Sequence, residues 1–254
     1  MINREFSSLA PRISPNTPGC PQPLIIQAVR NAAIRTCERT LGWRHAEPPY
    51  ELQPGVHEYL YRKPAGSDVH AVFGASINGY SLNHLPLDAA LQQYPSWADL
   101  YSGVPFEDLW TASGSFNEAA YNEQLLNGGA TFAMTDAAME AASEPRAITQ
   151  LTPDKYIVLP LPDNTKTYEL RLIYALKPKR EATGLPDNIF DELEDAIFHG
   201  AMQELMAIPN DAWHDRELAS YHAKQYIFHV TERRARSNLG NSRGSMTVRM
   251  RPLA

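Results

Sequence analysis

Two amphipathic segments in the last quarter of the chain constrain its fold more than any other feature. The first begins at Leu185-Pro186-Asp187-Asn188, where Pro fixes φ and Asp or Asn can cap the free amides of a first helical turn. It ends at Ile208-Pro209, because the residue before a proline is pushed out of the α region. Its apolar residues recur at steps of three and four, which predicts one apolar helix face: Ile189, Leu193, Ala196, Ile197, Gly200, Ala201 and Leu205.

The second segment follows after a four-residue turn and shows the same spacing. We expect Asp211 to cap it and Trp213 to lie in its first turn. Its predicted apolar face consists of Leu218, Ala219, Ala223, Tyr226, Ile227 and Val230. Helices joined by a short loop tend to be antiparallel neighbours, and small residues such as Gly200 let their backbones approach closely. The sequence therefore predicts a helical hairpin over residues 185–236.

The chain ends in a basic segment that contrasts with an acidic remainder. After Arg236 the periodicity stops, and residues 237–254 have too few bulky apolar groups to offset the entropy of ordering, so we expect them to order only on binding. Residues 232–254 hold six arginines and one glutamate, a net charge of +5, so the total of −6 leaves −11 on residues 1–231. Such asymmetry is typical of a tail that binds nucleic acid or an acidic protein surface, although a solvated terminus has the same composition.

The N-terminal region is predicted to be an extended arm followed by a helix. Five prolines interrupt residues 1–23 and favour an extended segment lying on a surface. A helical stripe then runs from Leu24 to Cys37, and Leu41-Gly42 closes it. A single amphipathic helix cannot bury its own stripe, so we expect this helix to join the C-terminal hairpin in one bundle.

The middle of the chain changes to short stretches that are typical of strands and turns. Strands are predicted at Tyr50–Leu52, His57–Tyr61, Val69–Phe73, Ser76–Leu82, Tyr156–Leu159 and Tyr168–Ala175, with a short helix at Leu87–Tyr94. Pro162-Asp163-Asn164 predicts a turn that joins the last two strands as a hairpin. The aromatic residues Tyr59, Tyr61, Phe73 and Tyr80 are assigned to core filling rather than to a platform that stacks on single-stranded nucleic acid.

Together these patterns predict an α+β fold. A helical bundle, formed by the N-terminal helix and the C-terminal hairpin, carries an inserted mainly β module and extended N- and C-terminal arms; two consecutive domains are the alternative. The expected divisions are an arm and bundle helix at 1–45, the β insertion at 46–184, the hairpin at 185–236 and a docking tail at 237–254.

Composition and motifs exclude several function classes. The chain has 43% apolar and 20% charged residues, no apolar run long enough to span a membrane and no secretory signal pattern, so we expect a protein made and kept in a cytoplasm. It contains no GxxxxGK[ST], GxGxxG, HExxH or GxSxG motif, and Cys20 and Cys37 lie far apart. We therefore expect neither an enzyme nor a bound cofactor or metal.

Two clusters of polar residues are weighed as sites and rejected. The first consists of Asp191, Glu192, Glu194 and Asp195, which could hold Mg²⁺. These residues wrap around the start of a helix, however, where a solvated acidic face suits the macrodipole. The second consists of His199, His214, His222 and His229. Only His222 and His229 share a face, and a spacing of seven is too long for one metal ion, so surface or interface histidines are expected.

Two regions of the sequence carry a resemblance to a known family. The first is Pro18-Gly19-Cys20-Pro21-Gln22-Pro23-Leu24 with the helix that ends in Thr36-Cys37-Glu38-Arg39-Thr40-Leu41-Gly42-Trp43-Arg44. The second runs from Tyr168-Glu169-Leu170-Arg171-Leu172 through Leu185-Pro186-Asp187 and Ala196-Ile197-Phe198-His199-Gly200-Ala201 to Pro209, Trp213, Tyr221 and Phe228. In this order the motifs resemble the head-to-tail adaptor (connector, or neck) proteins of tailed bacteriophages. Residues 50–145 match no pattern of that family.

The resemblance implies a structural virion protein, assembled in the host cytoplasm and located in the neck of the particle. Such proteins form a ring, typically dodecameric, between the portal protein and a tail or nozzle protein. The ring lengthens the channel through which genomic DNA passes without sequence-specific binding. In the family the C-terminal segment orders against the portal. Here that implies a portal-docking role for Arg233, Arg234, Arg236, Arg243, Arg249 and Arg251 and an intersubunit contact for the proline-rich arm.

A second hypothesis comes from the charge alone. A small nucleic-acid-binding protein would place the same arginines on phosphates, with an affinity that falls steeply with salt. The acidic remainder of the chain favours the adaptor, because negative walls do not hold the phosphates of DNA in a channel.

Overall fold

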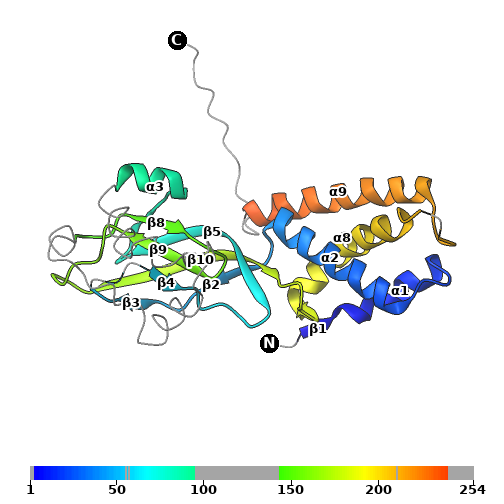
Figure 1. Cartoon of the computed structure of the whole chain (residues 1–254), viewed down its shortest axis with the longest axis horizontal. Coiled ribbons are helices and arrows are strands. Elements are labelled where there is room, and N and C mark those ends of the chain that lie inside the picture. The colour runs from blue at the N-terminus through cyan, green and yellow to red at the C-terminus, as the bar shows by residue number, and fades with distance from the viewer. Residues whose placement is uncertain (1–2, 55, 57, 95–142, 210, 240–254) are drawn as a thin grey trace, which may run out of the picture. The chain divides into compact units, whose positions relative to one another are not determined.

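The chain has a mixed α+β fold, seen in a computed structural model that describes residues 3–54, 56, 58–94, 143–209 and 211–239 (Figure 1). It divides into two compact units. The first comprises residues 1–44, 65–68 and 175–254, and the second comprises residues 45–64 and 69–174. None of the helices in the described ranges is both long enough and apolar enough to cross a membrane.

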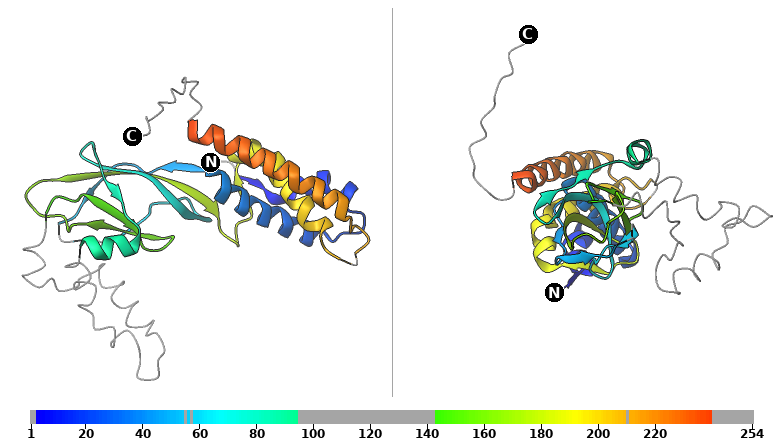
Figure 2. Two further views of the ribbon diagram at one scale, coloured as in Figure 1. Left: turned by 90° about the horizontal axis from the view of Figure 1, so that it is seen from above. Right: turned by 90° about the vertical axis from the view of Figure 1, so that its left-hand side faces the viewer.

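The first unit is mainly helical. Its elements are β1 (Asn3–Glu5), η1 (Phe6–Leu9), α1 (Ala10–Ile13), η2 (Ser14–Asn16), α2 (Gln22–Thr40), β11 (Gly184–Pro186), α8 (Asp187–Met206) and α9 (Arg216–Leu239). The helix α8 packs extensively against both α2 and α9, which touch each other less (Figure 2). Strand β1 pairs antiparallel with β11, from Asn3 opposite Pro186 to Glu5 opposite Gly184.

The three long helices meet at a glycine of α8. A Cβ added to Gly200 would lie 3.1 Å from the Cβ of Ala32 on α2 and 3.2 Å from the ring of Tyr226 on α9. A larger residue would push these helices apart, since interiors are close-packed. The close approach predicted for Gly200 therefore involves both neighbours of α8.

Helix α2 ends in a way that the sequence motif did not predict. Its buried face includes Ile25, Ala28, Ala32 and Cys37, in agreement with the predicted stripe. The residue that takes the left-handed conformation after the helix is Leu41, with φ 53° and ψ 31°, rather than Gly42. The Leu41 N–H donates to the Cys37 carbonyl at 3.0 Å, which closes the last turn.

The connection between α8 and α9 is longer than the predicted four-residue turn. It runs from Ala207 to Asp215, so Trp213 precedes α9 and does not lie in its first turn. The cap is Asp215, whose Oδ1 accepts from the backbone N–H groups of Glu217 and Leu218, both at 2.9 Å. The predicted cap, Asp211, instead accepts the His214 N–H on its carbonyl at 3.1 Å.

The buried faces of α8 and α9 differ from the predicted stripes. On α8 the face is wider than predicted, because Phe190, Phe198 and Met202 are also buried where α8 packs on two helices. On α9 the face is narrower, because Leu218 and Ile227 are 45% and 58% exposed. Apolar residues spaced three and four apart predict where a helix lies. They do not predict which apolar residues beside the stripe will be buried against another element.

The N-terminal segment is not the extended arm that its prolines predict. Short helices η1, α1 and η2 follow one another, and they bury Phe6, Leu9 and Ile13 in the first unit. Pro11 and Pro15 occupy positions in the first turns of α1 and η2, where a proline removes no hydrogen bond. The prolines therefore shorten the helices without preventing them.

The second unit is mainly β. Its strands are β2 (Arg44–Ala46), β3 (Tyr50–Leu52), β4 (Glu58–Leu60), β5 (Ser67–Ile77), β6 (Tyr80–Ser81), β7 (Asn83–His84), β8 (Ala147–Gln150), β9 (Lys155–Leu159) and β10 (Tyr168–Pro178). One sheet has the order β2-β10-β5-β6, with β3 also paired to β10, and the other has the order β4-β9-β8-β7. The ends of β2, β5 and β10 belong to the first unit. Helix α3 (Leu87–Gln93) contributes Ala90 to a small apolar cluster with Ala147 and Leu159.

The predicted hairpin of residues 156–159 with 168–175 is wrong. Strand β9 pairs with β8 and β4, whereas β10 belongs to the other sheet. The hairpin partner of β9 is β8, with Gln150 opposite Tyr156 and Ala147 opposite Leu159. Four consecutive residues of β9 are buried, which fits a strand covered on both faces, while the first part of β10 alternates. The different burial patterns are a reason for the two strands to lie in different sheets.

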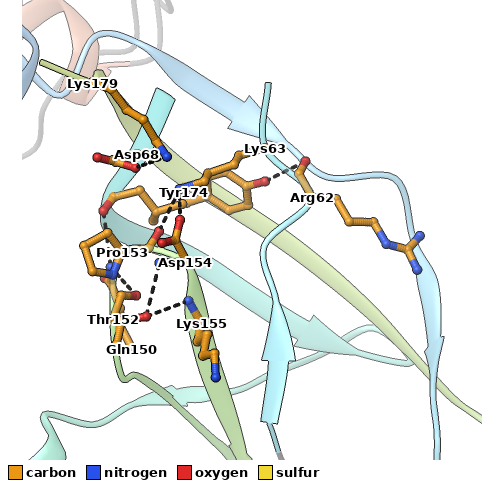
Figure 3. Close-up of polar contacts among 11 residues, drawn as sticks. Arg62, Lys63, Asp68, Gln150, Thr152, Pro153, Asp154, Lys155, Tyr174 and Lys179 are labelled. Carbon is orange, nitrogen blue, oxygen red and sulfur yellow. Dashed lines mark hydrogen bonds and ion pairs between the residues drawn. The ribbon is translucent and has the colours of Figure 1, made fainter. Parts of the chain in front are cut away.

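Polar contacts fix the turn between β8 and β9 (Figure 3). Thr152 Oγ1 accepts from the N–H groups of Asp154 at 3.3 Å and Lys155 at 3.1 Å. Lys63 forms an ion pair with Asp154 and donates to the Pro153 carbonyl at 3.4 Å. The Asp68–Lys179 ion pair of the first unit is drawn in the same figure, with 3.6 Å between the two charged atoms.

Candidate functional site

The predicted docking arginines are divided between a helix and undescribed residues. Arg233, Arg234 and Arg236 lie in the last turns of α9, which continues beyond the predicted end at Arg236 to Leu239. The other three predicted residues, Arg243, Arg249 and Arg251, lie outside the described residues. Residues 237–239, the start of the expected docking tail, are therefore helical, and Arg233, Arg234 and Arg236 stand on the same helix.

Two small hollows adjoin this end of α9. The larger, of about 270 Å³, is lined by Gly42, Arg44, Ile189, Glu192, Leu193, Arg233, Arg236 and Ser237. The smaller, of about 130 Å³, shares Glu192, Arg233 and Arg236 with it and adds Asp195 and Glu232. The arginines thus stand beside carboxylates of α8 and α9, and the larger hollow has more positive than negative groups.

The three helical arginines differ in their partners. Arg236 Nη2 lies 2.5 Å from Glu232 Oε1, one turn earlier on α9. Arg233 is half-buried and Arg234 is exposed, and within the described part of the chain neither makes an ion pair. A guanidinium without a carboxylate partner can form two parallel hydrogen bonds to a carboxylate or phosphate of another molecule. Arg233 and Arg234 have that capacity here.

The acidic cluster of α8 is on the surface, and arginines of the N-terminal segment bind three of its four carboxylates, those of Asp191, Glu194 and Asp195. Arg4 Nε lies 2.8 Å from Asp187 Oδ1, and Arg4 Nη1 lies 2.5 Å from Asp191 Oδ1. Arg12 binds Glu194 at 2.9 Å and Asp195 at 3.0 Å.

The rings of α8 complete these contacts, because each guanidinium also lies over a phenylalanine. Arg4 is 5.2 Å from the centroid of Phe190, and Arg12 is 4.3 Å from that of Phe198. The folded N-terminal segment brings both arginines to α8, and these pairs do not follow from the expectation of an extended arm.

Three of the four C-terminal histidines meet between α8 and α9. The Nδ1 atoms of His199 and His222 lie 2.8 Å apart, and the ring of His229 stacks on that of His199 at 5.4 Å. His214 lies apart from them and contacts the Met206 carbonyl at 2.9 Å. Sequence spacing on one helix could not reveal this cluster, because His199 is contributed by the other helix.

The packing of this cluster lowers the pKa of two of its histidines. Burial, and secondarily the charges of His222 and His229, lower the pKa of His199 to about 4, and burial also lowers the pKa of His222. An Nδ1–Nδ1 hydrogen bond needs one ring to donate and the other to accept, so it exists only while one ring is neutral. Within the described ranges, no three metal-ligating side chains are arranged to hold a metal ion.

The second unit contains a buried carboxylate among tyrosines. The Glu47 side chain is fully buried, burial raises its pKa, and its Oε2 has no hydrogen-bond partner within the described residues. The backbone N–H of Arg62 donates to Glu47 Oε1 at 3.3 Å, and Tyr174 Oη donates to the Arg62 carbonyl at 3.1 Å. Tyr61 packs on Tyr174 at 5.1 Å. Because these groups are covered by protein, they do not form a surface for a partner.

The predicted aromatic core is correct for part of its residues. Tyr61 is 6% exposed and packs edge-on or tilted against Tyr174 and Tyr156, and Tyr59 is half-buried. Phe73 and Tyr80 are 37% and 75% exposed, so they do not fill the core.

No protein-family model matches the chain, and no curated protein is significantly similar to it. The geometry of the site therefore rests on the residues alone. That geometry is a helix end with two guanidinium groups that make no ion pair with any described residue, next to a cluster of arginine–carboxylate pairs.

Proposed function

We propose that the protein is a non-catalytic structural subunit, a head-to-tail adaptor of a tailed phage particle, that docks through the arginines at the end of α9. The observation that carries the proposal is the absence of carboxylate partners for Arg233 and Arg234 within the described residues, at the point where the chain enters its basic last segment. A guanidinium pair of this kind is suited to carboxylates on the surface of a portal protein.

The arrangement of the chain supports this role. In the proposal, α2, α8 and α9 are the bundle that packs against neighbouring subunits, the β unit is a module inserted into that bundle, and residues 240–254 order on the portal. Docking supplies the contacts that offset the ordering entropy, so assembly waits for the correct partner. Because the rest of the chain is acidic, a ring of such subunits would let genomic DNA pass without holding its phosphates.

Truncation after Leu239 tests the docking role. We expect the shortened chain to remain soluble and folded, with the circular dichroism and unfolding midpoint of the full chain. It should fail to co-sediment with the portal protein encoded in the same viral genome. Co-assembly of the truncated chain at normal stoichiometry would show that residues 240–254 do not dock.

A DNA-binding measurement distinguishes the adaptor proposal from the nucleic-acid-binding hypothesis. If the arginines bind phosphates, the full chain binds duplex DNA at low salt, and the affinity falls with a slope of several counterions as salt rises. The adaptor proposal predicts no retention of DNA at about 50 mM salt, because a charge of about −11 on the remainder opposes it. Salt-sensitive binding of short duplexes, without portal binding, would replace the adaptor with the alternative.

A further inference from the structure

Helix α2 lines a groove that is both apolar and positively charged. The groove has a volume of about 910 Å³ and runs along α2 from Pro23 to Arg35. Ile26, Arg30 and Ile34 follow one another at steps of four, so Arg30 stands between two half-buried isoleucines on one helix face. Arg180 adds a second positive charge, and within the described ranges neither arginine makes an ion pair.

The carboxylate that lines this groove is already bound. Glu204 of α8 accepts from Asn31 Nδ2 at 2.7 Å through one oxygen and from Arg35 Nη2 at 2.6 Å through the other. Glu181 follows Arg180 in the sequence, but it is exposed and does not line the groove. Because guanidinium groups bind carboxylates with two parallel hydrogen bonds, the groove favours an occupant that brings carboxylates together with apolar side chains.

The chain itself contains a segment of that composition. Residues 95–142, which lie outside the described ranges, include seven carboxylates and no Lys or Arg. Within them, Phe106-Glu107-Asp108-Leu109-Trp110 places two adjacent carboxylates among three large apolar residues. Two carboxylates match the two arginines of the groove that make no ion pair, and the apolar residues match its isoleucines.

The other charged surfaces of the described residues fit this pairing less well. Three carboxylates of the acidic cluster on α8 are already bound by Arg4 and Arg12. At the end of α9, Glu192 lines both hollows beside the arginines and makes no ion pair with a described residue, so an acidic occupant would meet a like charge there. In the α2 groove, in contrast, Arg35 offsets the charge of Glu204.

The segment and the groove also match in length. At 1.5 Å per residue, the stretch of α2 from Pro23 to Arg35 is about 18 Å long. An extended chain rises about 3.3 Å per residue, so the five residues from Phe106 to Trp110 can span about 17 Å. The eleven residues 95–105 that precede them can extend by up to about 36 Å, which is enough to reach a neighbouring copy.

We propose that residues 106–110 of one copy dock in the α2 groove of another copy. Their two carboxylates bind Arg30 and Arg180. Their apolar side chains pack beside Ile26 and Ile34. The inference rests on the proposed ring and names its subunit contact. The two surfaces share no residue, so the contact is heterologous, and such a contact generates a ring or a filament rather than a two-fold dimer.

Mixing two variants of the full chain tests this contact. The groove variant is Arg30→Gln/Arg180→Gln, and the segment variant is Glu107→Gln/Asp108→Asn. In analytical ultracentrifugation the wild-type chain should self-associate, and each variant alone should do so about tenfold or more weakly. An equimolar mixture should restore association and stop at heterodimers, because each pair has one intact groove and one intact segment. A monomeric wild type, or a mixture that stays monomeric, would overturn the proposal.

The matched control is Arg233→Gln/Arg234→Gln, which removes the same charge at the end of α9. It should self-associate like the wild-type chain. If this control weakened association and the groove variant did not, the acidic segment would bind the end of α9 instead of the groove, which overturns the proposal.

A peptide gives a second readout that does not depend on assembly. A fluorescent peptide of residues 99–114 should bind the full chain, measured by anisotropy, and should bind the groove variant about tenfold or more weakly. Replacing Phe106 and Trp110 of the peptide by Ala should also weaken binding, because the apolar contacts are lost. Equal binding by the wild type and the groove variant, at the same folded fraction by circular dichroism, would contradict the proposal.

Electron micrographs of the same variants on portal separate this contact from the adaptor function. Rings of the groove variant that form as well as those of the wild type would place the subunit contact elsewhere and leave the adaptor function standing. The absence of rings for the wild-type chain would remove the adaptor function, whereas restored association in the mixture of variants would still establish the contact between copies.

Discussion

The arginines at the two ends of the chain are used in opposite ways. Near the N-terminus, Arg4 and Arg12 each bind two carboxylates of α8 at 3.0 Å or less, and each also lies over a phenylalanine ring. Near the C-terminus, Arg233 and Arg234 have no such partner within the described residues. The difference teaches that arginine content alone does not identify a docking surface, since one set is used to hold the fold together.

The largest loss of stability should come from a substitution that separates the N-terminal strand β1 from β11. A Cβ added at Gly184 would lie 2.2 Å from the Arg4 backbone oxygen, so Gly184→Ala forces β1 away from β11 and removes the Arg4 ion pairs. We expect a loss of about 3 kcal/mol in the free energy of unfolding, measured by urea denaturation. The control Gly74→Ala, whose added Cβ meets nothing within 4 Å, should cost about 1 kcal/mol or less. Equal losses would mean that the β1 contact does not stabilise the first unit.

Removing the second N-terminal arginine should have a smaller effect. Arg12→Ala loses the contacts with Glu194, Asp195 and the Phe198 ring, and both ion pairs are partly exposed, so we expect a loss of about 1–2 kcal/mol in unfolding free energy. Arg234→Ala, in contrast, should change it by no more than about 0.5 kcal/mol. If Arg234→Ala cost as much as Arg12→Ala, the distinction between structural and docking arginines would fail.

The histidine cluster predicts that the free energy of unfolding depends on pH. His199 is faced by His222 and His229 of α9, Asp195 of α8 and Arg12 of the N-terminal segment, and its pKa of about 4 lies below its unfolded value of 6.5. The unfolded chain therefore binds the extra proton first, and stability falls as pH drops from about 6.5 towards about 4.

The size of this pH effect is modest because the ring is partly open to solvent. We expect His199 to account for a loss of about 1 kcal/mol over that range after solvent screening. His199→Gln should flatten the curve of unfolding free energy against pH. Arg12→Ala should move the His199 pKa upwards, as seen by NMR titration, because a positive charge is removed. An unchanged curve for His199→Gln would assign the acid sensitivity to other groups.

Local patterns predicted the long helices well because their causes are local. The apolar spacing of α2 and α8 and the prolines at Pro186 and Pro209 mark these helices to within a few residues. Non-local contacts were not predictable in this way. The partners of β9 depend on which sheet covers its second face, and the meeting of His199 with His222 depends on how two helices pack.

The sequence of the N-terminal segment contains a helical signal together with prolines that favour an extended chain. Phe6, Leu9 and Ile13 recur at steps of three and four, which is a helical pattern, whereas the five prolines of residues 1–23 favour an extended segment. Without that folded segment Arg4 and Arg12 had no predicted partners, and the acidic cluster of α8 was assigned to solvent. The candidate site was predictable as a set of arginines, but the distinction between paired and unpaired ones needed the fold.

The most direct test of the account is electron microscopy of the full chain mixed with portal protein, compared with the double variant Arg233→Glu/Arg234→Glu. The adaptor proposal predicts a closed ring of subunits on the portal for the wild-type chain and bare portals for the variant, with both proteins equally folded by circular dichroism. Wild-type samples without rings, or rings that form equally well with the variant, would contradict it.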